Sequence, residues 1–434
     1  MSASQRFVAL LVAVLVVVGG AVVGLSFADG DRTATRPSAT PQPVASASSS
    51  AEPVASDGEP DPDEEEALAI LREIEEQVIA IRGLPAADVG APDLITRAEL
   101  AEELEALFEE DYPPEEQAAD NIALRALGLL EPGQDVVELQ LQLLGDQVLG
   151  FYDDVDKRMV VVTDAGLDAQ ARLTYAHEYT HALQDAAFGL DTLETDAEGQ
   201  DDRGFARTAL IEGDATVTMV AWALAHLSPE ELLEIGTGIE LPDTSGIPAW
   251  MVNQIQFPYN EGALWAGMMS GDPFAPDFSE IDAAYADPPD STEQIIDFDK
   301  WLSREEPAEV ELPDLAAALG DGWTEVDDTP IGEATLRITL EYFGVARDDA
   351  LAAARGWGGD RVVIVSGPDD EFALAWRLVW DTPADATEFL NAYKSILGSL
   401  PFPAMAMEVA GDEILVAHAA NDDLLRRTVA AAND

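Results

Sequence analysis

The chain has no cysteine, and lysine plus arginine account for only 22 of its 434 residues. Without cysteine there is no disulfide, iron–sulfur cluster, thiolate nucleophile, cysteine-based zinc site or lipid on an N-terminal cysteine. Against the 22 basic residues stand 85 acidic ones, which gives a net charge of −63. Because phosphate binding requires clustered lysine and arginine, we expect no nucleic-acid partner. We also expect no binding of the soluble part to an anionic lipid surface.

The acidic, lysine-poor composition indicates an environment rather than a substrate. High salt would screen the repulsion between so many like charges. A generally acidic protein of a high-GC bacterium explains the composition equally well. Hydrophobic residues still make up 47% of the chain, more than a disordered acidic chain contains. We therefore expect two or three domains, each with its own core.

The N-terminus predicts the location of the protein. An uncharged apolar run of 22 residues, Phe7 to Ala28, follows Arg6. As a helix it would be about 33 Å long, enough to cross the hydrocarbon core of a bilayer. It is either an uncleaved membrane anchor or a signal peptide cleaved after Ala28, and both place the rest outside the cytoplasm. Residues 29–62 are rich in proline, serine and alanine and predict a disordered linker.

The remaining pattern predicts a mainly α-helical α+β protein, with a helical domain at 63–330 and a small α+β domain at 331–434. Four amphipathic helices come first, followed by a hairpin of two strands at 149–153 and 158–162. A long helix at 168–188 should end at Gly189. The C-terminal domain follows a β-β-α-β-β-α order, with strands at 361–366 and 372–380, a helix at 384–397, strands at 404–409 and 413–417, and a helix at 424–432.

The long helix contains His177-Glu178-Tyr179-Thr180-His181. Two histidines four residues apart lie on one helical face, roughly 6 Å apart, so both rings can reach one ion. Glu178 lies at the edge of that face, where it can take a proton from a metal-bound water. The chain has only four histidines, so a chance match is rare. The motif predicts one zinc ion per chain, with His177 and His181 as ligands and Glu178 as the catalytic base.

A catalytic zinc ion usually takes three protein ligands and leaves a fourth position for water. The best candidate for the third ligand is Glu212, on a largely apolar helix expected at 202–226. An unpaired carboxylate is costly to bury there, and a metal ion would remove that cost. His226 lies about 21 Å further along the same helix, too far for the same ion. The surroundings of His418, in a predicted strand, do not resemble a site.

This combination resembles the gluzincin metallopeptidases, in which two histidines of a His-Glu-x-x-His helix and a glutamate on a later helix bind zinc. The resemblance implies a gluzincin-like core, with an edge strand before the zinc helix that aligns a peptide substrate, here about Met159 to Thr163. The chain is also similar to uncharacterised bacterial extracytoplasmic proteins assigned as metallopeptidases. That similarity runs from about residue 64 to the end and rests on segments 150–153, 177–181, 212–215, 257–262, 291–294 and 356–361.

One position departs from the gluzincin pattern. Many gluzincins carry an aspartate four residues after the glutamate ligand, hydrogen-bonded to a ligand histidine. Here that position is Thr216, and the nearest acid is Asp214. Since a hydroxyl accepts only weakly compared with a carboxylate, the partner of the ligand histidines stays open. Tyr259, at the expected entrance of a helix near Gly262, is the candidate to stabilise the oxyanion. A buried tyrosine with a satisfied hydroxyl explains Tyr259 as well.

Two functions compete. The first is a zinc-dependent peptidase that acts on peptide or protein substrates outside the cytoplasm, anchored by the N-terminal segment or secreted after its cleavage. The second is a non-catalytic, zinc-containing binding protein of the cell envelope. Glu178 distinguishes them, because a binding protein has no need of that carboxylate beside the ion. Substrate, specificity and oligomeric state stay open.

Overall fold

A computed structural model describes residues 62–144, 148–164, 166–238 and 244–433. The predicted anchor or signal segment, residues 7–28, lies outside this range, as does the predicted linker except for Pro62. Within the described part of the chain, no helix is long and apolar enough to cross a bilayer.

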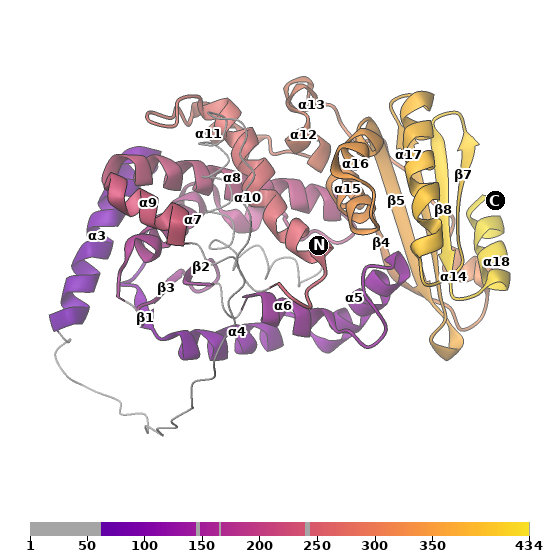
Figure 1. Cartoon of the computed structure of the whole chain (residues 1–434), viewed down its shortest axis with the longest axis horizontal. Coiled ribbons are helices and arrows are strands. Elements are labelled where there is room, and N and C mark those ends of the chain that lie inside the picture. Colours follow the sequence, from indigo (N-terminus) through magenta and orange to yellow (C-terminus); the bar gives the residue numbers. More distant parts are fainter. Residues whose placement is uncertain (1–61, 145–147, 165, 239–243, 434) are drawn as a thin grey trace, which may run out of the picture.

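Most of the chain before residue 304 forms a helical body with a small sheet (Figure 1). Labels follow Figure 1. The body comprises α3 (Pro62–Arg82), β1 (Asp93–Ile95), α4 (Arg97–Asp111), α5 (Pro114–Leu127), α6 (Val136–Leu144), β2 (Gly150–Asp153), β3 (Arg158–Val162), α7 (Ala169–Phe188), α8 (Asp201–His226), α9 (Pro229–Gly238), α10 (Ala249–Ser270), α11 (Ser279–Ala286), α12 (Thr292–Ile296) and α13 (Phe298–Ser303).

Helix α7 carries the histidine motif, and its limits agree with the prediction. Asp168 precedes the helix, and its side chain accepts a hydrogen bond from the backbone N–H of Ala171, a donor that the first helical turn leaves free. Gly189 ends the helix with φ of 70°, a conformation that glycine adopts without strain. Both caps are local signals, which is why the sequence predicted this helix correctly.

The three strands before α7 are ordered β1–β3–β2. The predicted hairpin is confirmed, since β2 and β3 pair antiparallel with Phe151 opposite Val160. Strand β1, which was not predicted, pairs parallel with β3 on its other side. The prediction of an edge strand at 159–163 is therefore wrong, because β1 occupies that edge. A strand of three residues is too short for sequence periodicity to reveal it.

Helices α8 and α10 meet through their backbones at Gly213 and Gly262. A Cβ atom on Gly213 would lie 2.3 Å from the carbonyl oxygen of Gly262, and one on Gly262 would lie 2.3 Å from that of Ala209. Only residues without a side chain allow this approach. Because Gly213 follows Glu212 directly, the crossing determines where Glu212 stands.

Helix α10 is longer than the sequence indicates. The prediction placed its start near Gly262, but the helix begins at Ala249 and contains Pro258. A proline inside a helix removes a hydrogen bond and costs about 3 kcal/mol. Burial of large apolar side chains along the helix offsets that cost; they are Trp250, Met251, Ile255, Phe257 and Trp265. Tyr259 consequently lies in the middle of a helix rather than at its entrance.

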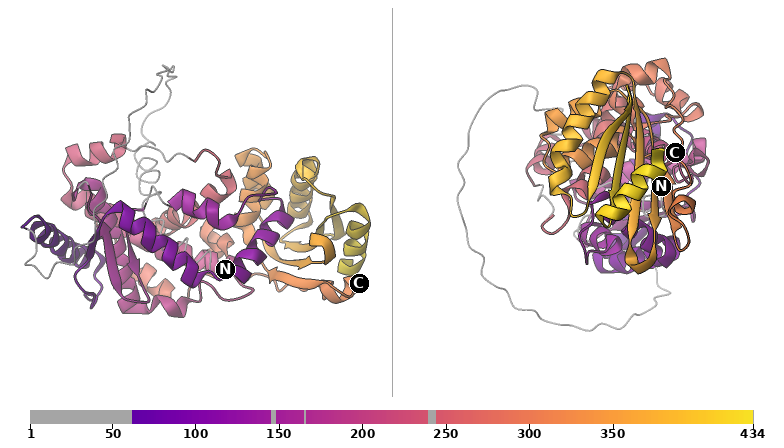
Figure 2. Two further views of the ribbon diagram at one scale, coloured as in Figure 1. Left: turned by 90° about the horizontal axis from the view of Figure 1, so that it is seen from below. Right: turned by 90° about the vertical axis from the view of Figure 1, so that its right-hand side faces the viewer.

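The C-terminal unit is an antiparallel sheet of five strands with helices on both faces (Figure 2). Its elements are α14 (Leu315–Leu319), β4 (Thr324–Thr329), α15 (Gly332–Tyr342), α16 (Arg347–Ala354), β5 (Trp357–Ser366), β6 (Phe372–Trp380), α17 (Pro383–Ile396), β7 (Ala404–Ala410), β8 (Glu413–Ala419) and α18 (Asp422–Asn433). The strand order is β4–β5–β6–β8–β7. Val362 and Ile364 pack with α15 to α17, whereas Val363 and Val365 pack with α14 and α18.

From β5 onward the predicted β-β-α-β-β-α order is confirmed. Strand β4 was not predicted, because its acidic sequence lacks a β pattern. It pairs with β5 and so brings residues before 331 into the sheet. Strand β5 begins at Trp357, within the glycine-rich segment 356–359. A bulge between Trp357 and Gly359 lets the strand accommodate the glycines.

Buried carboxylates lie where the sheet meets the helical body. Asp360 of β5 accepts hydrogen bonds from four groups, the backbone N–H groups of Ile331 and Gly332 and the indoles of Trp357 and Trp376. Asp202 of α8 accepts from the backbone and hydroxyl of Thr292. Burial raises the pKa of Asp360 to about 6 and that of Asp202 to about 7.

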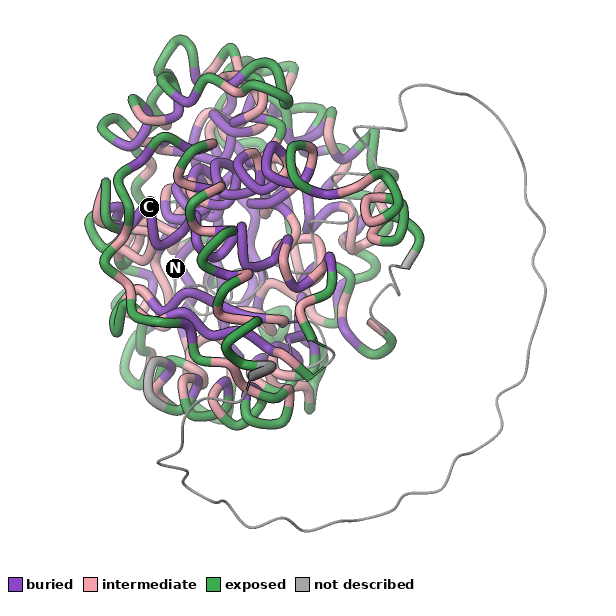
Figure 3. The backbone as a smooth tube through the Cα atoms, turned by 90° about the vertical axis from the view of Figure 1, so that its left-hand side faces the viewer, coloured by how far each residue is buried: buried purple, intermediate pink, exposed green. Residues whose placement is uncertain are grey.

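One apolar core of the helical body lies around α7 and α8. Buried stretches gather in the interior and exposed ones at the rim (Figure 3). Leu71, Ile74 and Val78 of α3 pack in one apolar cluster with Tyr179 of α7 and Trp222 of α8. This packing holds α3 and α8 against α7, the helix that carries the histidine motif.

Candidate metal centre

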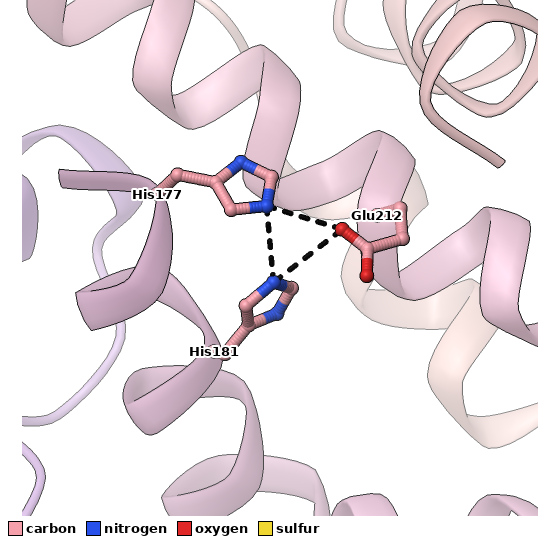
Figure 4. Close-up of side chains that lie close together, drawn as sticks. All are labelled: His177, His181 and Glu212. Carbon is pink, nitrogen blue, oxygen red and sulfur yellow. Dashed lines mark hydrogen bonds and ion pairs between the residues drawn. The ribbon is translucent and has the colours of Figure 1, made fainter. Parts of the chain in front are cut away.

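His177, His181 and Glu212 meet between α7 and α8 (Figure 4). The Nε2 atom of His177 lies 3.1 Å from Nε2 of His181 and 3.1 Å from Oε2 of Glu212. His181 Nε2 lies 3.4 Å from the same oxygen. Ligands bound at about 2.0–2.1 Å to a tetrahedral ion stand about 3.3 Å apart. The three atoms therefore have the spacing of three ligands to one ion, and the group can hold a metal.

The three side chains lie in the interior, with exposed fractions of 0% for His177, 8% for His181 and 2% for Glu212. Burial lowers the pKa of His177. Burial also opposes the charge on His181, but the Glu212 carboxylate raises its pKa to about 9. Burial alone would raise the pKa of Glu212, yet the two imidazoles lower it to about 2. The cluster thus favours an ionised Glu212 balanced by positive charge, which a divalent cation would supply.

Glu178 stands next to His177 and is 2% exposed. Its Oε2 atom accepts a hydrogen bond of 3.1 Å from the backbone N–H of Tyr152 in β2. Its Oε1 atom is buried and has no hydrogen-bond partner among the described residues. Burial raises the pKa of Glu178 to about 8. One carboxylate oxygen is held while the other is left to accept a proton, which fits a base beside an ion.

The backbone N–H of Tyr152 is a contact that the sequence analysis missed. Strand β2 is the outer strand of its sheet and presents this group to Glu178. The hydroxyl of Tyr152 donates to Asp185 of α7 at 2.8 Å, and Lys157 in the hairpin turn binds the same carboxylate. Both contacts fix β2 against α7. A backbone contact leaves no signal in residue type, so the sequence predicted the strand but not this contact.

Tyr259 lies beside the ligand His177. The centroids of the two rings are 5.9 Å apart, and Tyr259 is 2% exposed. Its helix, α10, reaches this position through the crossing at Gly262, about one turn further on. The structure therefore brings Tyr259 to the centre, although the sequence misplaced the start of its helix. Its role in stabilising an oxyanion stays a prediction.

The partner of His181 is Gln184, not Asp214 or Thr216. Nδ1 of His181 lies 2.8 Å from Oε1 of Gln184, and Asp214 contacts Gln184 instead. The hydroxyl of Thr216 is buried without a hydrogen-bond partner in the described part of the chain. Spacing alone points to Gln184, which lies three residues after His181 and so on the same helical face.

The remaining two histidines lie outside the metal-binding group found among the described residues. His418, in β8, contacts the hydroxyl of Tyr393 and the carbonyl oxygen of Ala126. His226 is the last residue of α8 and stacks on Trp222. That neither of these histidines is a metal ligand stays a prediction.

Comparison with known protein families gives a match in the C-terminal unit. A family model described as "Domain of unknown function (DUF8575)" matches residues 320–428. The matched segment begins just before β4 and ends in α18, so it covers the five-stranded sheet and α15 to α17, but not α14. No curated protein and no solved structure matches the chain. The metal centre lies outside the matched segment, so its assignment rests on its geometry and its motif.

Proposed function

We propose that this chain is a zinc-dependent peptidase that hydrolyses peptide bonds outside the cytoplasm. The observation that carries the proposal is Oε1 of Glu178, which is buried without a hydrogen-bond partner among the described residues and lies one residue from His177 in a group of three possible ligands. Three protein ligands leave the fourth position of a tetrahedral zinc ion for water, whereas structural zinc sites are closed by a fourth protein ligand. An open position next to an available base is what hydrolysis requires.

Each residue of the centre has a separate role in the proposed hydrolysis. Bound zinc would polarise the scissile carbonyl and lower the pKa of a water molecule. Oε1 of Glu178 takes a proton from the water and passes it to the leaving amine. The N–H of Tyr152 holds Oε2, so the carboxylate keeps its orientation through both transfers. Tyr259 donates a hydrogen bond to the oxyanion that develops on the carbonyl.

The location and the partners belong to the same proposal. The apolar run at 7–28 supports an anchored or secreted protein whose acidic part faces outward. The net charge of −63 argues against nucleic acid and leaves peptides or proteins as substrates. N-terminal sequencing of the mature protein distinguishes the two forms, because a cleaved chain begins after Ala28.

Glu178→Gln tests the function. The amide keeps the size of the side chain and an acceptor for Tyr152, but it cannot take a proton. We expect zinc to remain bound and peptide cleavage to fall about 10²–10⁴-fold, the usual contribution of a general base. Zinc content and cleavage of unfolded casein are measured on the same samples, with chelated and zinc-restored wild type as controls. Cleavage at the wild-type rate by Glu178→Gln would contradict the assignment.

A non-catalytic zinc-binding protein of the envelope is the second candidate. The burial of all three ligands favours it, because a substrate must reach the ion to be cleaved. A zinc-loaded wild-type chain that cleaves no peptide, and a Glu178→Gln variant that behaves identically, would select this candidate over the peptidase.

A further inference from the structure

His181 is held by a chain of hydrogen bonds that leads away from the metal centre. Its Nδ1 atom lies 2.8 Å from Oε1 of Gln184. The amide nitrogen of Gln184 donates to the carbonyl oxygen of Ile211 and to Oδ2 of Asp214, both at 2.9 Å. Gln184 has an exposed fraction of 0%, so bulk water does not compete for these bonds.

These contacts decide which nitrogen of a neutral His181 ring carries the proton. The carbonyl of Ile211 and the carboxylate of Asp214 can only accept, so the amide nitrogen of Gln184 must face them. The amide oxygen then faces His181 and also can only accept, so Nδ1 of His181 must donate. The lone pair of Nε2 is thereby free on the atom that faces His177 and Glu212. Such partners fix both the tautomer and the orientation of a ligand histidine.

Asp214 is anchored from the other side by Arg82. Nε and Nη2 of Arg82 lie 2.8 and 3.1 Å from the two carboxylate oxygens, and the hydroxyl of Tyr285 donates at 2.9 Å. Neither side chain of the Arg82–Asp214 pair is exposed. A buried bidentate pair is geometrically strict, because a charged group that loses its partner there is costly. Asp214 is therefore a fixed support for Gln184.

Arg82 is the last residue of α3, the first helix in the described part of the chain. We propose that Arg82, Asp214 and Gln184 are positioning residues of the metal centre, and that Arg82, at the end of α3, acts through Asp214 and Gln184 to raise the affinity of the centre for a metal ion. The proposal rests on the metal centre of the proposed function but does not depend on peptide cleavage. Arg82 thereby connects the end of α3 to metal binding.

A purely structural effect of α3 can be distinguished from the proposed effect of Arg82 on the metal centre. Helix α3 also binds α7 through a hydrogen bond of 2.6 Å from the Tyr175 hydroxyl to Glu75. It binds α8 through a bond of 2.8 Å from the indole of Trp222 to Gln77. Neither bond involves Gln184 or Asp214. Loosening α3 at Glu75 therefore weakens its docking while the chain to His181 stays intact.

Zinc binding to the full chain in detergent, measured by competition with a chromophoric chelator, tests the proposal. Gln184→Met keeps the side-chain size, removes the hydrogen bonds, and should weaken zinc binding about 10–100-fold. Arg82→Met combined with Asp214→Asn removes both buried charges together, so neither is left unpaired, and should weaken binding by a smaller factor. All three substitutions together should bind zinc as Gln184→Met does, because the residues act through one chain. Glu75→Ala should bind zinc as the wild type does.

Far-UV circular dichroism of the zinc-free proteins checks that each variant folds. If the double variant of Arg82 and Asp214 does not fold, Gln184→Met alone still tests the proposal. Wild-type zinc affinity in Gln184→Met would overturn the proposal. So would an equal loss of affinity in Glu75→Ala and in the Arg82 double variant, because that result assigns the effect to docking alone. A wild-type chain that binds zinc but cleaves no peptide would refute the proposed function and leave the positioning chain standing.

Discussion

At the scale of the residue, the surroundings give two buried glutamates opposite properties. Burial dominates at Glu178 and raises its pKa to about 8. At Glu212 the two imidazoles outweigh burial and lower the pKa to about 2. Groups whose pKa values are separated by their surroundings divide into different chemical roles. Glu212 is suited to remain an ionised ligand, and Glu178 is suited to exchange a proton near neutral pH.

Tyr259→Phe tests the other predicted catalytic group. Loss of one donor to an oxyanion typically lowers kcat about 10²–10³-fold, and we expect that loss with zinc content and KM little changed. Steady-state kinetics on a peptide substrate measure it. Tyr175→Phe is the matched control, since it removes a hydroxyl that contacts Glu75 away from the ligands, and should keep the wild-type kcat. A wild-type kcat in Tyr259→Phe would give its hydroxyl a structural role only.

At the scale of the element, the glycine crossing of α8 and α10 positions two parts of the centre. Glu212 precedes Gly213 on α8, and Tyr259 precedes Gly262 on α10 by about one turn. Because the backbones touch at these glycines, neither helix can shift without moving a residue of the site. The outer strand β2 acts in the same way on Glu178, through the N–H of Tyr152. Three elements thus surround the motif helix and determine its geometry.

Gly262→Ala tests the crossing. The new methyl group would lie 2.3 Å from the carbonyl oxygen of Ala209, so α8 and α10 must separate, with a loss of stability of about 1–3 kcal/mol. Zinc affinity should fall with it, because Glu212 moves away from the histidines. Urea unfolding and zinc competition measure the two effects. Gly267→Ala, in the same helix with nothing within 4 Å of its Cβ, should stabilise by up to about 1 kcal/mol.

At the scale of the whole molecule, acidic side chains are abundant and some are buried. The net charge of −63 makes the folded chain repel itself at low salt. Burial raises the pKa of Glu293 to about 8, that of Asp202 to about 7 and that of Asp360 to about 6. These carboxyl groups lie where the C-terminal sheet meets the helical body. Protonation of these carboxyl groups therefore favours the folded state.

The sign of the pH dependence follows from these groups. Between about pH 4 and 8 the folded chain binds protons that the unfolded carboxylates release, so stability falls as pH rises. His418 opposes this trend, because burial lowers its pKa to about 4. We expect a higher urea midpoint at pH 5.5 than at pH 8.5, measured in 1 M NaCl to screen surface repulsion. Glu293→Gln should flatten the dependence, and a midpoint that rises with pH would contradict the account.

The sequence by itself determined the features that depend on local signals. The caps at Asp168 and Gly189 define the motif helix, and the spacing of His177 and His181 defines a metal-binding face. The cost of burying a carboxylate in a largely apolar helix indicated Glu212. Runs of apolar residues predicted strands in this sheet, as in β5 and β6, because both of its faces are buried. These signals act within one or two helical turns or one strand, the range over which sequence patterns are informative.

Only the tertiary structure decided the contacts between distant segments. Strand β1 covers the edge of β3, the N–H of Tyr152 reaches Glu178, and Gly213 meets Gly262. Arg82 and Asp214 are 132 residues apart in the chain yet share two hydrogen bonds. No local pattern encodes such pairings, because each depends on how whole helices and strands pack against one another. Local chemistry thus indicated the candidate ligands, and packing decided how their side chains are held.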